Sequence, residues 1–270
     1  MALQQVHVPV DLAAAAAHLG RGSSVALLAG GTLLMPFVNT QPSAIAELVS
    51  IRRLGLAGAS VADGRVSLGA ATTLAEVGED PRLDFLRPTI ESIASPPIRN
   101  LATVGGNLFA RQPYGDLAVA LLALDAVVRI AGPDGERIAP VADVLNSGIA
   151  PGEIATAVEF DLPPAGGWFY TKAMRRAYNS GAIVVVAAVI EIADGVVAAA
   201  RVALGGVGPR PARAGAVEAA LVGKPLDRPS VEAAAALAAD GVDPFTDAYA
   251  SAWYRARVLP VHVRRAILGE

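Results

Sequence analysis

The sequence predicts an α+β fold, and three observations lead to that class. Stretches with the apolar spacing of strands and stretches with that of helices are mixed along all 270 residues. They do not follow the regular strand–helix–strand period of a parallel α/β sheet. A run of proline and glycine at 163–167 then separates the last hundred residues as a further α+β unit.

The first 56 residues are expected to hold one helix and two short strands. Asp11 is placed to cap a helix that ends at Leu19, just before Gly20. The strands are expected at 24–28 and 46–50, and the first of them runs directly into a glycine pair.

The middle of the chain is expected to contain two hairpins, three helices and a strand. Asp63-Gly64 and Pro133-Asp134-Gly135 are typical turn sequences between alternating apolar residues. Thr73 is placed to cap a helix, and Ser95-Pro96-Pro97 to stop another. The expected hairpins are 61–70 and 127–138, the helices 74–77, 90–93 and 117–124, and the strand 153–162.

The last hundred residues are expected to form three strands and then helices. The Asp194-Gly195 pair predicts a tight turn between the second and third strands. The expected strands are 169–174, 182–192 and 196–204, and the expected helices are 214–222, 231–239 and 247–268.

Charge and cysteine content exclude several classes of function. The net charge is −3, so the chain has no basic field with which to hold nucleic acid. It has no cysteine, which excludes disulfides, thiolate catalysis and iron–sulfur clusters held by this chain alone. No carboxylate pair or His–Ser arrangement indicates acid–base or nucleophilic catalysis. We therefore nominate no catalytic and no metal-binding residue.

Nothing in the sequence indicates a secreted or membrane protein. The N-terminus has neither the basic region nor the apolar core of a signal peptide. The most apolar stretch, 182–190, is far shorter than the ~20 residues of a membrane-spanning helix. We expect a cytoplasmic protein without a transmembrane segment.

Two glycine segments have the composition of phosphate-binding loops. Residues 27–34 read LLAGGTLL and residues 103–107 read TVGGN, so each places a glycine pair beside a hydroxyl or amide side chain. Glycines let a ligand approach the backbone, and successive N–H groups can converge on an anion. Facing each other, the two loops would clamp a pyrophosphate without any Lys or Arg. Taken singly, each glycine pair is better explained as an ordinary tight turn.

The familiar nucleotide fingerprints are missing. There is no G-x-x-x-x-G-K-[ST] sequence. Gly20-Arg21-Gly22-Ser23-Ser24-Val25 lacks the third glycine of a dinucleotide-binding motif, and it precedes a strand instead of following one. We reject it as a binding motif.

Longer motifs extend the two glycine segments along essentially the whole chain. They are AGGTLL at 29–34, IRNLATVGGNL at 98–108, DLAVALLALDA at 116–126, KAMRR at 172–176, ALGGVGP at 203–209, Arg213-Ala214 and Tyr254-Arg255. In this order they resemble the FAD-binding subunit of the xanthine dehydrogenase and carbon monoxide dehydrogenase family of molybdenum hydroxylases. Its loops read A-G-G-T-D/S-L and I-R-N-x-x-T-[IV]-G-G-N-[IL].

The resemblance implies a domain organisation. A two-part FAD-binding domain of the vanillyl-alcohol-oxidase (PCMH) type would span residues 1–56 and 57–166. A C-terminal α/β domain of the CO dehydrogenase flavoprotein type would span residues 168–270.

The resemblance also implies which residues bind FAD. The two glycine segments would hold the pyrophosphate and neighbouring groups, and Asp116 would accept hydrogen bonds from ribose or ribityl hydroxyls. Ile93 and Ala155 would pack around the flavin, and Lys172 would approach the isoalloxazine ring. The implied cofactor-binding residues are Leu27, Leu28, Ala29, Gly30, Gly31, Thr32, Leu33, Leu34, Ile93, Thr103, Val104, Gly105, Gly106, Asn107, Asp116, Ala155 and Lys172.

Single residues refine this interpretation. The motifs contain no histidine or cysteine, so we expect FAD to be held non-covalently. Leu33 replaces a polar or acidic residue of the family, which predicts one hydrogen bond fewer and a lower FAD affinity. Tyr178 follows the Lys172 segment and is a weaker candidate for the flavin environment. Four arginines of the last helix are expected on a solvated or subunit-facing surface: Arg255, Arg257, Arg264 and Arg265.

The implied function is that of an electron-transfer subunit. A large subunit with a molybdenum cofactor would hydroxylate the substrate, and a small subunit would carry [2Fe-2S] clusters. Electrons would pass through these clusters to FAD on this chain and then to an external acceptor. The implied assembly is a dimer of heterotrimers. The lack of cysteine fits, because the cluster ligands would have to come from a partner.

Two alternatives stay open. A stand-alone FAD-dependent oxidase or reductase would use the same FAD site, but it requires catalytic side chains over the flavin. A non-enzymatic α+β binding or scaffold protein, with ordinary glycine turns, would not bind FAD.

Overall fold

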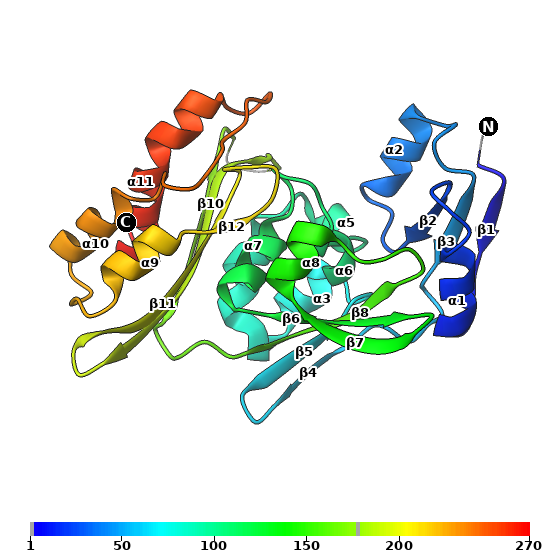
Figure 1. The fold of residues 1–270 in the computed structure, drawn as a ribbon, viewed down its shortest axis with the longest axis horizontal. Coiled ribbons are helices and arrows are strands. Elements are labelled where there is room, and N and C mark those ends of the chain that lie inside the picture. Colours follow the sequence, from blue (N-terminus) through cyan, green and yellow to red (C-terminus); the bar gives the residue numbers. More distant parts are fainter. Residues whose placement is uncertain (1–2, 177–178) are drawn as a thin grey trace. The chain divides into compact units, whose positions relative to one another are not determined.

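The computed structural model describes residues 3–176 and 179–270 and has the α+β architecture that the sequence predicts (Figure 1). Contacts group the chain into two compact units. Unit 1 consists of the chain up to Asp84, Pro96–Ala110 and Val127–Phe160. Unit 2 consists of Phe85–Ser95, Arg111–Ala126 and Asp161–Glu270. The domain boundaries implied by the resemblance stay a prediction, and Tyr178 lies outside the described residues.

Unit 1 contains a parallel sheet with the strand order β1-β3-β2. Parallel strands need crossover connections, which two helices provide. The carboxylate of Asp11 caps the first helix as predicted, accepting a hydrogen bond of 2.7 Å from the N–H of Ala14. The elements are β1 (Gln5–His7), α1 (Leu12–Leu19), β2 (Val25–Leu28), α2 (Leu34–Thr40) and β3 (Glu47–Ser50).

Unit 1 also contains a five-stranded sheet with the order β4-β5-β8-β6-β7. Both predicted hairpins are present in it. In the first, Asp63 and Gly64 have φ of 50° and 78°, and two consecutive positive φ angles are what a type I′ turn requires. The strands are β4 (Ala59–Ala62), β5 (Arg65–Gly69), β6 (Val127–Gly132), β7 (Gly135–Pro140) and β8 (Ile154–Asp161).

Short helices accompany this sheet, and two of them differ from expectation. Pro96-Pro97 starts a helical turn instead of only stopping one, because proline is favoured at the first helical position. Residues 103–107 are a capped helical turn, with the Thr103 hydroxyl accepting from the N–H of Gly106 at 3.1 Å. The helices are α3 (Leu74–Glu79), α5 (Pro96–Arg99), α6 (Val104–Leu108) and α8 (Val141–Ser147); the 3-10 helix η1 (Pro81–Leu86) leads into unit 2.

Unit 2 is built on an antiparallel sheet with the order β12-β11-β10-β9. From Ala182 to Ile190 every residue of β10 is buried, because helices α7 and α11 both pack against this strand. A strand buried on both faces is a continuous apolar run. The elements are α4 (Arg87–Glu91), α7 (Asp116–Ala123), β9 (Trp168–Met174), β10 (Ala182–Ala193), β11 (Val196–Gly205), β12 (Ala212–Arg213), α9 (Gly215–Leu221), α10 (Arg228–Ala235) and α11 (Ala252–Leu268).

The last helix begins later than predicted, at Ala252 instead of residue 247. The Asp247 carboxylate accepts hydrogen bonds from the N–H groups of Tyr249 and Ala250, which hold this segment in a turn. Ser251 then caps the helix through the N–H of Tyr254.

The prediction that Arg255 lies on a solvated or subunit-facing surface is wrong. Its side chain is completely buried. The guanidinium donates to the carbonyls of Ala182, Ile183 and Gly206, and it pairs with Asp247 at 2.8 Å. Arg255 therefore joins the last helix to the strands of the unit 2 sheet.

Within the described part of the chain, no helix is both long and apolar enough to cross a bilayer.

Replacing Arg255 by Met is expected to lower the free energy of unfolding by about 3–5 kcal/mol, because three buried carbonyls and a carboxylate lose their partner. Urea denaturation of the purified chain measures this. Arg257→Met, on the exposed face of the same helix, is the matched control and should change stability by less than about 0.5 kcal/mol. Equal effects of the two substitutions would contradict the assigned role.

Candidate functional site

Unit 1 contains a cavity of about 680 Å³, a volume typical of sites for small molecules and cofactors. Three stretches of chain form most of its wall: the segment that follows β2, the helical turn α6, and the approach to β8. The lining residues are Leu19, Gly22, Ser23, Val25, Leu27, Ala29–Leu34, Ile51, Ala70, Ala102, Thr103, Gly105–Asn107, Phe109 and Ile149–Glu153 with Ala155.

Both glycine segments singled out in the sequence line this cavity. Of residues 27–34 all but Leu28 belong to the wall, and of residues 103–107 all but Val104. Val104 is instead fully buried in the core beneath the wall. Ala155, from the third stretch, belongs to the same wall. Twelve of the seventeen candidate residues are thus brought to one cavity.

The two glycines of the first segment are required for different reasons. A Cβ on Gly30 would lie 1.7 Å from the carbonyl oxygen of Leu101, so a side chain there would prevent the two segments from meeting. Gly31 has a φ of 71°, in the left-handed region that glycine adopts at no cost. Gly30 therefore allows the close contact with Leu101, and Gly31 sets the direction in which the chain continues.

The first segment also presents unused hydrogen-bond donors. Among the described residues, the backbone N–H groups of Gly30, Gly31, Thr32 and Leu33 donate to no acceptor. Unsatisfied N–H groups in succession favour an anion, and here they line a cavity. This row of four N–H groups is called the donor row below.

The second segment uses its donors differently. The N–H groups of Val104 and Gly105 donate to the carbonyls of Thr72 and Ala70, each at 2.9 Å. Those of Gly106 and Asn107 donate to Thr103. These groups stabilise the fold, so the contribution of this segment to the cavity is its shape and the Asn107 side chain.

The cavity wall has almost no ionisable groups. Glu153 is the one titratable side chain among the lining residues that the structure describes. Its carboxylate accepts from Arg137 at 2.6 and 2.7 Å and from the N–H of Ala150 at 2.7 Å. The hydrogen bonds from Arg137 hold the pKa of Glu153 below its usual range. The negative charge of Glu153 is therefore already paired with Arg137.

Unit 2 contains a buried polar cluster with two further candidate residues. The ammonium of Lys172 donates to the Asp116 carboxylate at 2.7 Å and to the Ser92 carbonyl at 2.8 Å. The hydroxyls of Ser92 and Tyr170 are hydrogen-bonded at 2.8 Å. Lys172 and Asp116 each expose only 3% of the side chain, so this is a nearly dry ion pair.

The buried ion pair has unusual electrostatics. Burial raises the pKa of Asp116 to about 6, although the Lys172 ammonium acts in the opposite direction. Burial and the negative charge of Asp116 raise the pKa of Tyr170 well above its ordinary value. Ile93, the remaining candidate residue, is buried in the same unit.

Several wall residues carry no signal in the sequence. Gly22, Ser23 and Val25 belong to the rejected fingerprint, yet they line the cavity. Residues 149–152 lie between the predicted hairpin 127–138 and the predicted strand 153–162, in a stretch for which the sequence predicts no element. Sequence spacing does not reveal them, because they reach the wall only through the pairing of β8 with distant strands.

Two family models together match nearly the whole chain. Residues 2–163 match the family described as FAD binding domain in molybdopterin dehydrogenase. Residues 168–269 match the CO dehydrogenase flavoprotein C-terminal domain.

Individual relatives are similar over nearly their full length. The carbon monoxide dehydrogenase medium chain of Afipia carboxidovorans is 32% identical, over 97% of this chain and 94% of the relative. A putative xanthine dehydrogenase FAD-binding subunit of Escherichia coli is 30% identical, over 97% and 94%. A chain of reconstituted CO dehydrogenase from Oligotropha carboxidovorans superposes with a TM-score of 0.92 at 32% identity, covering 98% of this chain and 96% of that chain.

The protein is thus an FAD-binding oxidoreductase subunit. It belongs to the family of flavin-binding medium chains of carbon monoxide and xanthine dehydrogenase-like molybdenum hydroxylases.

The cavity suits FAD in three respects that the structure itself shows. Its donor row offers uncharged partners for pyrophosphate oxygens, and the single carboxylate in its wall is already paired. Its volume lies within the range of cofactor sites.

Replacing Leu33 by Ser is expected to tighten FAD binding by about 5-fold, because a hydroxyl in the cavity wall adds one hydrogen bond of about 1 kcal/mol. Fluorescence titration of the FAD-free chain gives the dissociation constant. Val10→Ser, which removes an exposed apolar side chain away from the cavity wall, should leave the constant unchanged. Weaker binding by the Leu33 variant would refute this account.

Replacing Lys172 by Met is expected to lower the free energy of unfolding at neutral pH by about 3–5 kcal/mol, because Asp116 becomes an unpaired buried charge. Without the ammonium, the pKa of Asp116 rises above about 6. The folded protein then binds a proton that the unfolded chain does not, so the loss shrinks as pH falls through this raised pKa.

Urea denaturation from neutral to mildly acidic pH tests this sign. The matched control is Lys224→Met, at an exposed lysine in the turn after α9, which should show neither the loss nor its pH dependence. A pH-independent loss in the Lys172 variant would exclude the buried ion pair as its cause.

Proposed function

We propose that this chain is the electron-transfer subunit of a heteromeric molybdenum hydroxylase. The observation that carries the proposal is a cofactor-sized cavity that offers a row of backbone donors. The single titratable side chain among its described lining residues, Glu153, is already hydrogen-bonded. Bound FAD would supply the redox chemistry, taking electrons from iron–sulfur clusters of a partner and passing them to an external acceptor. The protein itself binds and tunes the cofactor.

The proposed FAD-binding residues are those that the resemblance implies, and each unit is described by itself. In unit 1, the donor row receives the pyrophosphate, and the rest of residues 27–34 and 103–107, with Ala155, shapes the site. In unit 2, Asp116 and Lys172 supply polar groups and Ile93 an apolar one. The Lys172 ammonium is held by Asp116 and Ser92, so its positive charge has a fixed position. Near the flavin, such a charge stabilises the reduced, anionic form. No covalent link to FAD is proposed.

The proposed partners follow from what this chain lacks. It has no cysteine, so [2Fe-2S] clusters require a small iron–sulfur subunit. The molybdenum cofactor and the substrate site would lie on a large subunit. We propose a dimer of these heterotrimers in the cytoplasm.

Replacing Gly31 by Ala tests the assigned site within the assembly. The new Cβ would meet Leu28 and Met35 at 3.2 Å in a backbone conformation that alanine resists, so the donor row must shift. We expect at least about a 10-fold loss of FAD affinity, since an effect of about 1.4 kcal/mol suffices. Gly195→Ala is the matched control, because Gly195 has a similar φ of 79° but open space around it.

The decisive experiment is affinity purification of the chain from its native host, followed by subunit, metal and flavin analysis. The proposal predicts recovery with a molybdenum subunit, an iron–sulfur subunit and FAD, and loss of FAD alone in the Gly31 variant. A chain recovered with FAD but without partners, which oxidises an organic substrate with O₂, would establish the stand-alone oxidase. A chain that binds no FAD under any condition would refute both.

A further inference from the structure

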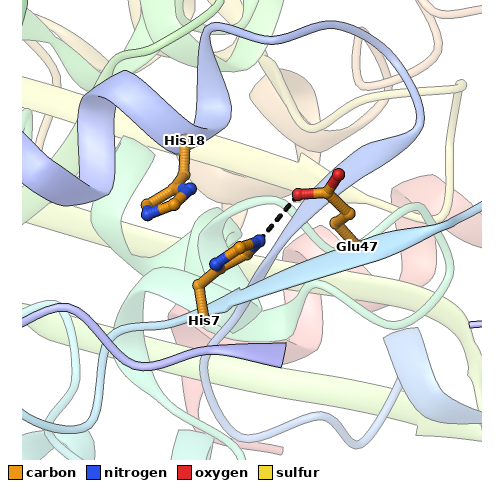
Figure 2. Close-up of side chains that lie close together, drawn as sticks. All are labelled: His7, His18 and Glu47. Carbon is orange, nitrogen blue, oxygen red and sulfur yellow. Dashed lines mark hydrogen bonds and ion pairs between the residues drawn. The ribbon is translucent and has the colours of Figure 1, made fainter. Parts of the chain in front are cut away.

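Two histidines and a glutamate gather in unit 1, on three different elements. His7 comes from β1, His18 from α1 and Glu47 from β3 (Figure 2). One potential ligand atom from each residue lies within 4.8 Å of the other two. His7 Nε2 and Glu47 Oε2 are hydrogen-bonded at 2.7 Å, as the dashed line in Figure 2 shows. These three residues are called the histidine cluster.

The fold does not use all the polar groups of this cluster. The Nδ1 atom of His18 is buried and has no hydrogen-bond partner among the described residues. A buried ring nitrogen without a partner costs free energy, which a ligand would recover.

The residue types suit a divalent transition metal. Imidazole nitrogen and carboxylate oxygen are zinc ligands at about 2.0–2.2 Å, and a tetrahedral ion therefore separates its ligand atoms by about 3.4 Å. The distances within the cluster, from 2.7 Å to at most 4.8 Å, bracket that separation. Three protein ligands also leave one coordination position open.

We propose that His7, His18 and Glu47 form a binding site for Zn²⁺ that joins β1, α1 and β3. The inference does not depend on the proposed electron-transfer function.

One side-chain movement is required. The two imidazole rings are stacked, with centroids 3.9 Å apart and planes at 26°, so their in-plane lone pairs lie in two nearly parallel planes. One ring must turn for both to face the same ion. His18 is the ring that turns, because it gives up no hydrogen bond formed with the described residues. Arg21 lies 3.6 Å from Glu47 and would be displaced from this carboxylate by the ion.

The position of the cluster gives zinc an effect on the cofactor cavity. His18 precedes Leu19, which lines the cavity together with Gly22 and Ser23. Fixing the end of α1 therefore fixes part of that wall. Zinc that binds only the folded chain also raises its melting temperature, by about 5 °C at 100-fold excess over the dissociation constant.

The test uses the full chain, freed of metal by a chelator and then dialysed against ZnCl₂. The proposal predicts one bound zinc per chain, and at least about a 10-fold weaker affinity in His18→Gln and in Glu47→Gln. His262→Gln is the matched control, because His262 is the remaining histidine and lies on α11 in unit 2. It should bind zinc as the wild-type chain does.

A measurement on the unaltered chain keeps the test valid if a variant fails to fold. X-ray absorption at the zinc edge should show two imidazole nitrogens and a carboxylate oxygen at about 2.0–2.2 Å. Failure to retain stoichiometric zinc, a spectrum without two imidazoles, or an equal loss in the His262 variant would overturn the proposal. None of these results decides whether the chain binds FAD, which is measured separately by its absorbance.

Discussion

The candidate site depends on a single backbone contact, the approach of Gly30 to the carbonyl of Leu101. The space between them is too small for any side chain, since a Cβ would lie 1.7 Å from that oxygen. This contact holds the segment after β2 against the segment before α6. The cavity forms between them, and the four residues of the donor row line it.

In the proposed site, the two glycine segments contribute differently to the binding of an anion. The second segment satisfies its own N–H groups through Thr72, Ala70 and the Thr103 cap, so it is a rigid wall. In the first, four successive N–H groups donate to no acceptor among the described residues, so they are available to a ligand in the cavity. An uncharged cradle of this kind binds pyrophosphate without lysine or arginine, because several N–H dipoles together replace a cation.

Unit 2, in contrast to the nearly uncharged cavity wall of unit 1, contains two buried cationic side chains among its described residues. The side chains of Lys172 and Arg255 are both buried and each pairs with one carboxylate; Lys172 also donates to one carbonyl and Arg255 to three. Such a buried cation adds little net stability to the fold. Removing it is nevertheless strongly destabilising, because its carboxylate partner becomes an unpaired buried charge. Arg255 therefore serves the fold of unit 2, whereas Lys172 combines a structural role with the position of a charge that suits flavin tuning.

Local signals made much of the fold predictable. The Asp11 cap, the Asp63-Gly64 turn and the apolar strand from Ala182 depend on neighbouring residues, and the structure contains all three. Strand β1 and helix α2 are too short to produce a periodic pattern. The burial of Arg255 is set by strands far away in the sequence, so an amphipathic helix alone suggested exposure. The histidine cluster is equally non-local, because His7, His18 and Glu47 meet only through the β1–β3 pairing and the return of α1.

The residues that line the candidate site could be predicted in part. The glycine pairs and their hydroxyl neighbours pointed to residues 27–34 and 103–107, and both segments line one cavity. The sequence did not show that the first segment has four successive N–H groups without an acceptor among the described residues, because that depends on hydrogen bonds across the fold. Nor did it show Ile149–Gly152, which reach the wall through the register of β8.

The central claim is that backbone N–H groups of Gly30–Leu33 bind the cofactor's pyrophosphate. A crystal structure of the chain with FAD tests it most directly. The account predicts pyrophosphate oxygens hydrogen-bonded to this donor row, with no arginine or lysine side chain in contact. A pyrophosphate bound elsewhere, or held mainly by basic side chains, would contradict it.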